Sequence, residues 1–284
     1  MCFNSVLIQV SSDNSFQQRI HWAQKLTSAE NSRIHGVYFQ SGLSTMAEAA
    51  PDLVMAPEGV AYVPEIAKNS KTILKEDLQN VRKLINASSL DDKSFHWMTV
   101  PGELAEQLPL VSLTHDLVVL SRNWFNGYDK VKLNSLLPDL SASLSAPLLV
   151  LPEHVPEHEF FKKPLVVWDN SAQAARALKS ALPLLTKVGT TGIFCDFHGS
   201  DEYDIVALEE VASWLECHGI TVTTVNSAQD NKSLSASIHD VVAENNHDIV
   251  IIGAQQESML RNMVFGNQTE QVLAQSSVPV LINN

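Results

Sequence analysis

The hydrophobic and polar positions of this 284-residue chain alternate between two kinds of segment. Short, nearly continuous apolar runs are separated by longer segments in which apolar residues recur every three or four positions. The first pattern is typical of strands buried on both faces, and the second is typical of amphipathic helices. Their alternation predicts an α/β fold in which helices cover both faces of parallel sheets.

The pattern places five strands and about four helices in each half of the chain. In the first half, strands are expected at 6–10, 35–39, 95–100, 117–120 and 148–151, with helices beginning near Ser15, Pro64, Gly102 and Ser135. In the second half, strands are expected at 165–168, 191–197, 220–225, 248–253 and 278–282. Ser171 is a good N-cap for the first helix of that half, and a short helix is expected from Asn267 to about Ala274.

The two halves repeat each other. "HDLVVLS" from His115 matches "HDIVIIG" from His247, an offset of 247 − 115 = 132, and "SAPLLVL" and "SVPVLIN" keep that offset. Asp-Asn-Ser occurs at 13–15 and again at 169–171, an offset of 169 − 13 = 156. The first half should therefore carry 156 − 132 = 24 extra residues, and the segment 42–64, which lacks a periodic apolar face, accounts for them. The period is too long for a solenoid and indicates a duplicated domain.

The duplication predicts two tandem doubly wound domains, each with a five-stranded parallel sheet. We expect the first domain at residues 1–152 and the second at 164–284. The linker at 153–163 is rich in proline and charge.

Composition excludes several classes of protein. The net charge of −13, without a dense Lys/Arg cluster, argues against a nucleic-acid partner. The sequence contains no apolar run of membrane-spanning length and no basic N-terminal leader, and its three cysteines form no CxxC motif. We therefore expect a cytoplasmic protein without a membrane partner. His154 and His158 have helical spacing, but Pro156 lies between them, so no metal site is predicted.

Ligands of open parallel sheets bind beyond the carboxyl ends of the strands, so the residues that follow each strand are the candidates. In the second half, Asp169 follows the first strand and Gly253 closes the fourth. Gly266 precedes the short helix, whose first N–H groups, at Asn267, Gln268 and Thr269, could hold a phosphate. A structural interpretation remains open for each candidate: Asp169 as a turn or cap residue, and the glycines as a strand exit and a helix entry.

The order of elements, the Asp after the first strand and the glycine-bounded loop before "SVPVLI" resemble a universal stress protein domain, and the whole chain resembles the tandem form of that family. The resemblance implies an ATP-binding loop of pattern G-x2-G-x9-G-[ST], followed after one residue by Ser or Thr. Gly253, Gly266 and Thr269 match this pattern. Gln256 stands in place of the second glycine, and Asn267 in place of the first hydroxyl residue.

The first half departs further from the same pattern. Its corresponding residues are Ser121, Trp124, Asn134, Ser135 and Leu137. None of the three glycines is present, and a tryptophan side chain would block a phosphate cradle. We therefore expect ATP or a related adenine nucleotide only in the second half, with its adenosine near Asp169.

These observations predict a regulatory protein of the universal stress type. We expect no catalytic residues, because no lysine or metal-binding acid is placed for phosphoryl transfer. The alternative is an interaction protein that uses the same fold as a scaffold without nucleotide. A homo-oligomer and a further protein partner are expected in either case. We also expect the fifth strands of the two halves to lie together. The segment 42–64 is expected to cover the carboxyl edge of the first sheet, with disorder of the segment as the alternative.

Overall fold

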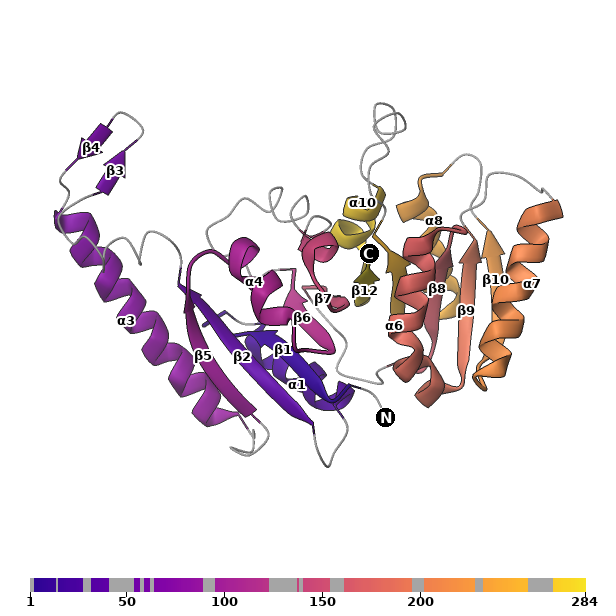
Figure 1. The fold of residues 1–284 in the computed structure, drawn as a ribbon, viewed down its shortest axis with the longest axis horizontal. Helices are drawn as coiled ribbons and strands as arrows, with labels where there is room; N and C mark the ends of the chain where they lie inside the picture. Colours follow the sequence, from indigo (N-terminus) through magenta and orange to yellow (C-terminus); the bar gives the residue numbers. More distant parts are fainter. Residues whose placement is uncertain are drawn as a thin grey trace.

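A computed structural model of the whole chain gives its three-dimensional structure. It describes residues 3–13, 15–27, 32–40, 54–56, 59–61, 64–88, 95–122, 137, 140–153, 161–195, 202–227, 232–254 and 268–284. Strands and helices alternate along these residues, as the sequence predicts (Figure 1). The expected α/β class is confirmed.

The elements follow the predicted order in both halves, with two additional short strands in the 42–64 segment; the helix expected near Ser135 begins outside the described residues. The first half contains β1 (Ser5–Gln9), α1 (Phe16–Leu26), β2 (Arg33–Gln40), β3 (Val54–Ala56), β4 (Gly59–Ala61), α3 (Pro64–Ala87), β5 (Phe95–Pro101), α4 (Leu104–Ser112), β6 (Leu117–Ser121) and β7 (Leu148–Leu151). The second contains β8 (Pro164–Trp168), α6 (Ala172–Val188), β9 (Thr190–Cys195), α7 (Glu202–Cys217), β10 (Thr221–Ser227), α8 (Leu234–Asn245), β11 (Ile249–Gly253), α10 (Gln268–Gln275) and β12 (Val280–Asn283). Strands β7 and β8 flank the expected linker, of which residues 154–160 lie outside the described residues.

The strands of both halves form one ten-stranded sheet, in the order β10-β9-β8-β11-β12-β7-β6-β1-β2-β5. Within each half all five strands are parallel. The two halves meet where β12 pairs antiparallel with β7, with Leu281 opposite Leu149 (Figure 1). The expectation that the two fifth strands lie together is confirmed: each covers the edge that the other would expose to water.

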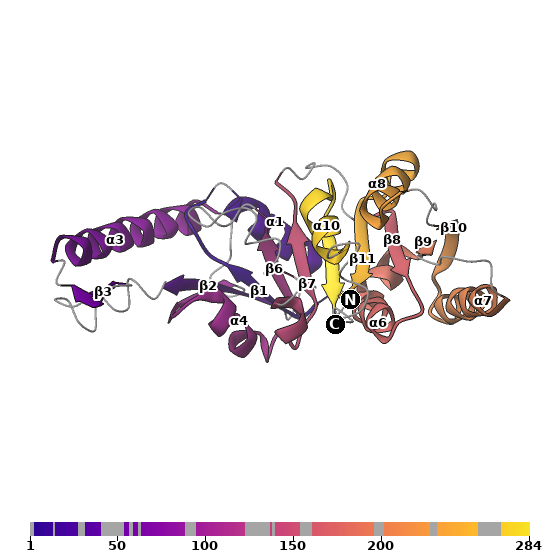
Figure 2. The same ribbon diagram turned by 90° about the horizontal axis from the view of Figure 1, so that it is seen from above.

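Alternate residues along the strands contribute to the cores on opposite faces of the sheet. One core contains Val6 and Ile8 of β1 and residues of α1, α3, α6 and α7. The other contains Leu7 of β1 and residues of α4, α8 and α10. Figure 2 shows α3 and α4 on opposite sides of the first five strands, and α6 and α8 on opposite sides of the second five. Both cores include residues from both halves, so apolar packing continues across the β7–β12 junction.

The repeated His-Asp pair has a structural role at the amino ends of the strands. A carboxylate oxygen of Asp116 accepts hydrogen bonds from the N–H groups of Asn4 and Ser5, each at 2.9 Å. In the second half, Asp248 accepts from the N–H groups of Lys162 and Lys163 at 2.6 and 3.1 Å. Each aspartate thus fixes the start of the first strand of its half to the start of the fourth, which explains why the motif occurs twice.

The structure corrects the register of the repeat at its opening. Val6 of β1 lies opposite Leu117, and Pro164 of β8 lies opposite Ile249, so equivalent positions of these first strands differ by 164 − 6 = 158. The buried faces of the first helices keep the same offset: Phe16, Arg19, Ile20 and Ala23 correspond to Ala174, Ala177, Leu178 and Ala181.

The two Asp-Asn-Ser motifs are therefore not equivalent, although the sequence reading paired them at an offset of 156. Strand pairing and helix burial place Ser11 at the position of Asp169, and Asp13 at the position of Ser171. A three-residue match of turn-forming residues cannot fix register, because such residues precede many helices. The strands and core fix it here.

The described part of the 42–64 segment is a small hairpin of β3 and β4. Both views place it at the outer end of α3, beyond the edge strand β5 and away from the ends of β1 and β6 (Figures 1 and 2). Residues 42–53 lie outside the described residues. The hairpin does not cover the carboxyl edge of the first sheet, and for this part of the segment the expected lid is wrong.

Candidate functional site

The predicted site of the second half begins at the turn that joins β8 to α6. A carboxylate oxygen of Asp169 accepts the N–H of Ser171 at 3.0 Å, and the Ser171 hydroxyl accepts the N–H of Ala174 at 3.0 Å. Asn170 lies between them with a positive φ of 59°. Asp169 therefore stabilises the turn and Ser171 caps the helix, as expected for Ser171.

Gly253 lies beside this turn because β11 and β8 are neighbouring parallel strands. A Cβ atom on Gly253 would lie only 2.5 Å from the backbone nitrogen of Ala174 and 2.6 Å from the carbonyl carbon of Gln173. Only glycine lets the first turn of α6 approach the end of β11 so closely. The close approach brings Asp169 and Gly253 to one edge of the sheet, which is the edge where the sequence predicts them.

The remaining candidates belong to the region around α10. The helix begins at Gln268, one residue after the predicted start, while Gly266 and Asn267 lie outside the described residues. The side chain of Thr269 is fully buried, and so is that of Leu137 at the corresponding position of the first half. Thr269 therefore has a packing role, and its contact with a phosphate stays a prediction.

The equivalent edge of the first half contains an arginine that is fully buried. Arg19, on α1, donates from Nε to the carbonyl oxygen of Gln9 at 2.8 Å. Its Nη2 lies 2.8 Å from a carboxylate oxygen of Asp13 and 2.6 Å from the hydroxyl of Ser11, and its Nη1 donates to the hydroxyl of Ser15 at 3.0 Å. The guanidinium thus joins the end of β1, the following turn and the start of α1.

The charge of Arg19 keeps Asp13 ionised. Burial alone would raise the pKa of the Asp13 carboxyl, but the charge of Arg19 and the hydrogen bonds from Arg19, Ser11 and Ser15 outweigh it. The pKa of Asp13 is therefore lower than its ordinary value. Asp13 and Arg19 form a buried ion pair.

A second group of hydrogen bonds joins the same edge to α3. One carboxylate oxygen of Asp77 accepts the hydroxyl of Ser12, and the other accepts the hydroxyl of Tyr38 at 2.6 Å. Burial and the neighbouring Asp77 raise the pKa of Tyr38, so its hydroxyl remains a donor at neutral pH. The carboxyl ends of β1 and β2 are thereby held to each other by the protein's own side chains.

The two halves therefore differ at equivalent positions of one edge. The first half has Ser11 and Arg19 where the second half has Asp169 and Ala177. In the first half, the polar groups at this edge bind the buried guanidinium of Arg19. In the second half, the carboxylate of Asp169 lies at the edge and no arginine occupies the position of Arg19. The sequence reading missed Arg19, although its place between Phe16 and Ile20, on the apolar face of a helix, was a usable signal.

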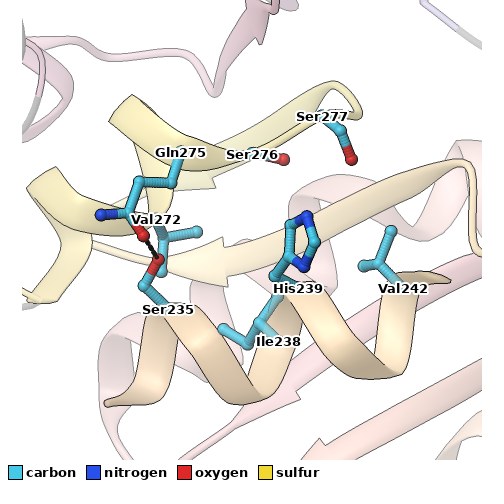
Figure 3. Close-up of a pocket in the computed structure, with 8 residues that line it drawn as sticks. All are labelled: Ser235, Ile238, His239, Val242, Val272, Gln275, Ser276 and Ser277. Atoms are coloured by element: carbon cyan, nitrogen blue, oxygen red, sulfur yellow. Dashed lines mark hydrogen bonds between the residues drawn. The ribbon is translucent and has the colours of Figure 1, made fainter. Parts of the chain in front are cut away.

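The structure has a small hollow elsewhere, between α8 and α10. Figure 3 shows its lining residues, Ser235, Ile238, His239, Val242, Val272, Gln275, Ser276 and Ser277. The Ser235 hydroxyl donates to the side-chain oxygen of Gln275 at 2.7 Å. The hollow has a volume of about 10 Å³, enough for about one water molecule, and it lies outside the predicted site.

No group of three or more His, Cys, Asp and Glu side chains among the described residues could hold a metal ion. His154 and His158 lie outside these residues. None of the described helices is both long enough and apolar enough to cross a bilayer.

Comparison with known proteins connects the second half to a family. Residues 161–283 match the sequence model of the universal stress protein family. None of the curated proteins matches the sequence significantly. The sequence resemblance noted for the second half is thus confirmed.

Solved structures match the chain along nearly its whole length. A universal stress protein from Archaeoglobus fulgidus is 19% identical with a TM-score of 0.62, over 99% of this chain and 96% of that chain. A putative universal stress protein from Pseudomonas aeruginosa is 13% identical with a TM-score of 0.52, over 99% and 93%. A functionally unknown protein from Pseudomonas aeruginosa, 13% identical, has a TM-score of 0.53 over 99% and 92%. These likenesses show that the whole chain has the fold of tandem universal stress proteins.

Proposed function

We propose that this chain, whose second half belongs to the universal stress protein family, is a regulatory protein of the stress response that binds an adenine nucleotide in its second domain. The observation that carries the proposal is the difference between the two halves at the carboxyl edge of the sheet. In the first half, Arg19 neutralises Asp13 inside the protein. In the second half, Asp169 and Gly253 lie at the same edge and Ala177 replaces the arginine.

The ligand that fits this edge is ATP or a related adenine nucleotide. Its adenosine would lie near Asp169, whose carboxylate can accept hydrogen bonds from a ribose or a base. Its phosphates would lie near Gly253, Gly266 and the start of α10 at Asn267, Gln268 and Thr269, where backbone N–H groups favour an anion. Gln256 in place of a glycine and the net charge of −13 both weaken phosphate binding, so the affinity should be modest.

We propose that the protein acts by binding and not by catalysis. The residues named for the site offer a carboxylate, backbone N–H groups and amides, which hold a nucleotide but do not transfer its γ-phosphate. We further propose a cytoplasmic location, because the cysteine content of the chain suits that compartment. A homo-oligomer with a protein partner also belongs to this proposal.

Titration of ATP against the full chain tests the proposal. Gly266→Val places a branched side chain against the expected phosphates and should abolish binding without unfolding the protein. Asn134→Val is the matched control, because residue 134 occupies the corresponding position of the first half, 266 − 132 = 134. The control should bind ATP as the wild type does, as measured by isothermal titration calorimetry.

The outcomes separate the two functions considered. Binding that Gly266→Val removes and Asn134→Val keeps supports the proposed site. Equal loss in both variants, or binding that only Asn134→Val removes, would place the site elsewhere. A wild-type chain that neither binds ATP nor gains thermal stability from it would favour the scaffold alternative.

A further inference from the structure

Arg122 connects the first half of the chain to a helix of the second half. It follows the last residue of β6, and its N–H donates to the carbonyl oxygen of Leu151 at 2.8 Å, which fixes it at the end of β7. Its side chain crosses to the other half. There, Nη1 donates to the carbonyl oxygens of Leu273, Ala274 and Ser276 at 3.1, 2.8 and 3.0 Å.

The carbonyl groups of Leu273 and Ala274 belong to the last turn of α10 (Gln268–Gln275), and Ser276 directly follows the helix. The last carbonyls of a helix have no partner within the helix and carry its negative partial charge. A half-buried guanidinium at this end therefore satisfies the carbonyls and neutralises their charge. The first half thus caps a helix of the second half.

The contact breaks the symmetry of the two halves. The residue that corresponds to Arg122 in the second half is Ala254, since 122 + 132 = 254. The alanine side chain has no donor to return the contact, although β7 and β12 pair in register with each other. Arg122 of the first half thus contacts a helix of the second half, and Ala254 makes no corresponding side-chain hydrogen bond to the first half.

The opposite end of α10 is the one where the proposed phosphates would lie. The helix has eight residues, so its two ends are about 12 Å apart. A helix this short has little stability of its own and depends on its tertiary contacts for a fixed position. Fixing its C-terminal end therefore also fixes the direction in which its first N–H groups point.

We propose that Arg122 is a positioning residue for nucleotide binding: by holding α10 across the junction of the two halves, the first domain sets the affinity of the second. This inference rests on the proposed function. It gives the first half, whose own edge is closed by Arg19, a part in ligand binding.

The experiment compares the full-length wild type with Arg122→Ala, Arg122→Lys and the control Arg82→Ala, which removes an exposed arginine of α3. Hydrogen exchange of the α10 amides reports local opening, and calorimetric titration with ATP, well below the melting temperature, reports affinity. Arg122→Ala should speed α10 exchange and weaken ATP binding about tenfold, a coupling of ordinary size. Arg122→Lys should restore part of both, and Arg82→Ala should change neither.

Each outcome decides a different part of the inference. Unchanged α10 exchange in Arg122→Ala would overturn the helix contact. Faster exchange with unchanged ATP affinity would show that Arg122 is only a structural cap. A wild type that binds no ATP would overturn the proposed function and the positioning role together. Should Arg122→Ala fail to fold, Arg122→Gln, which keeps two donors without the charge, takes its place.

Discussion

Arg19 shows how one buried side chain can join the end of a strand, the following turn and the start of a helix. It lies on the face of α1 that packs on the sheet, where its neighbours are apolar, and it is fully buried. Such a charge is tolerated because Asp13 pairs with it and three further groups accept its hydrogen bonds: the Gln9 carbonyl and the hydroxyls of Ser11 and Ser15. The sequence alone indicates an arginine in a buried stripe. It cannot indicate the partners, which come from a strand end and a turn.

Replacing Arg19 tests this interpretation. Arg19→Met should destabilise the chain by about 3–5 kcal/mol at pH 7, because it leaves the buried carboxylate of Asp13 without its counter-charge. Chemical denaturation of the full chain measures the change. Arg82→Met, at an exposed position of α3, should alter stability by less than about 0.5 kcal/mol. A loss in Arg19→Met no larger than in the control would contradict the buried pair.

The same pair predicts a dependence on pH. The pKa of Asp13 is lower in the folded chain than its ordinary value of 3.8, so its contribution to stability is present above that value. The contribution is lost as the pH falls through the folded pKa. The stability difference between wild type and Arg19→Met should therefore shrink on acidification below about pH 4. Denaturation curves that keep the same separation down to pH 2 would argue against the ion pair.

At the scale of elements, the approach of α6 to β11 shapes the candidate site. The sequence predicts both elements and both residues, Asp169 and Gly253, from their places after strands. It cannot predict that Gly253 is required by the backbone of Gln173 and Ala174, because that contact joins residues about 80 positions apart in sequence. Gly253 is therefore required by packing, whether or not a ligand binds.

Gly253→Ala should therefore destabilise the second half by about 1–3 kcal/mol, since the new methyl group meets helix backbone and not a movable side chain. The matched control is Ser121→Ala in the first half. The buried Ser121 hydroxyl has no hydrogen-bond partner among the described residues, so its loss should cost little. Thermal denaturation of both variants makes the comparison. Equal melting temperatures for Gly253→Ala and wild type would refute the close approach.

At the scale of the molecule, the two halves are one folded unit. The sheet continues through the β7–β12 pair, and both cores contain residues from both halves. The repeat, the succession of strands and helices along each half and the meeting of the fifth strands were predictable, because apolar runs and gap-free repeats are strong signals. The register of the opening repeat and the position of the β3–β4 hairpin were not. They depend on long-range pairing and on a segment without periodicity.

Continuity of the sheet predicts cooperative unfolding. Calorimetry of the full chain should show a single transition whose van't Hoff and calorimetric enthalpies agree, because separating the halves would expose β7 and β12 and divide both cores. Two resolved transitions would mean that the halves unfold independently and that the pairing of β7 with β12 contributes little to the stability of the chain.

The central claim is that the fused molecule has one nucleotide site, in its second half. A crystal structure of the full chain grown with ATP tests it most directly. The account predicts one nucleotide per chain, beside Asp169 and Gly253 and at the start of α10, and none at the edge closed by Arg19 and Asp13. A nucleotide bound at that first edge, with the second edge empty, would contradict the claim.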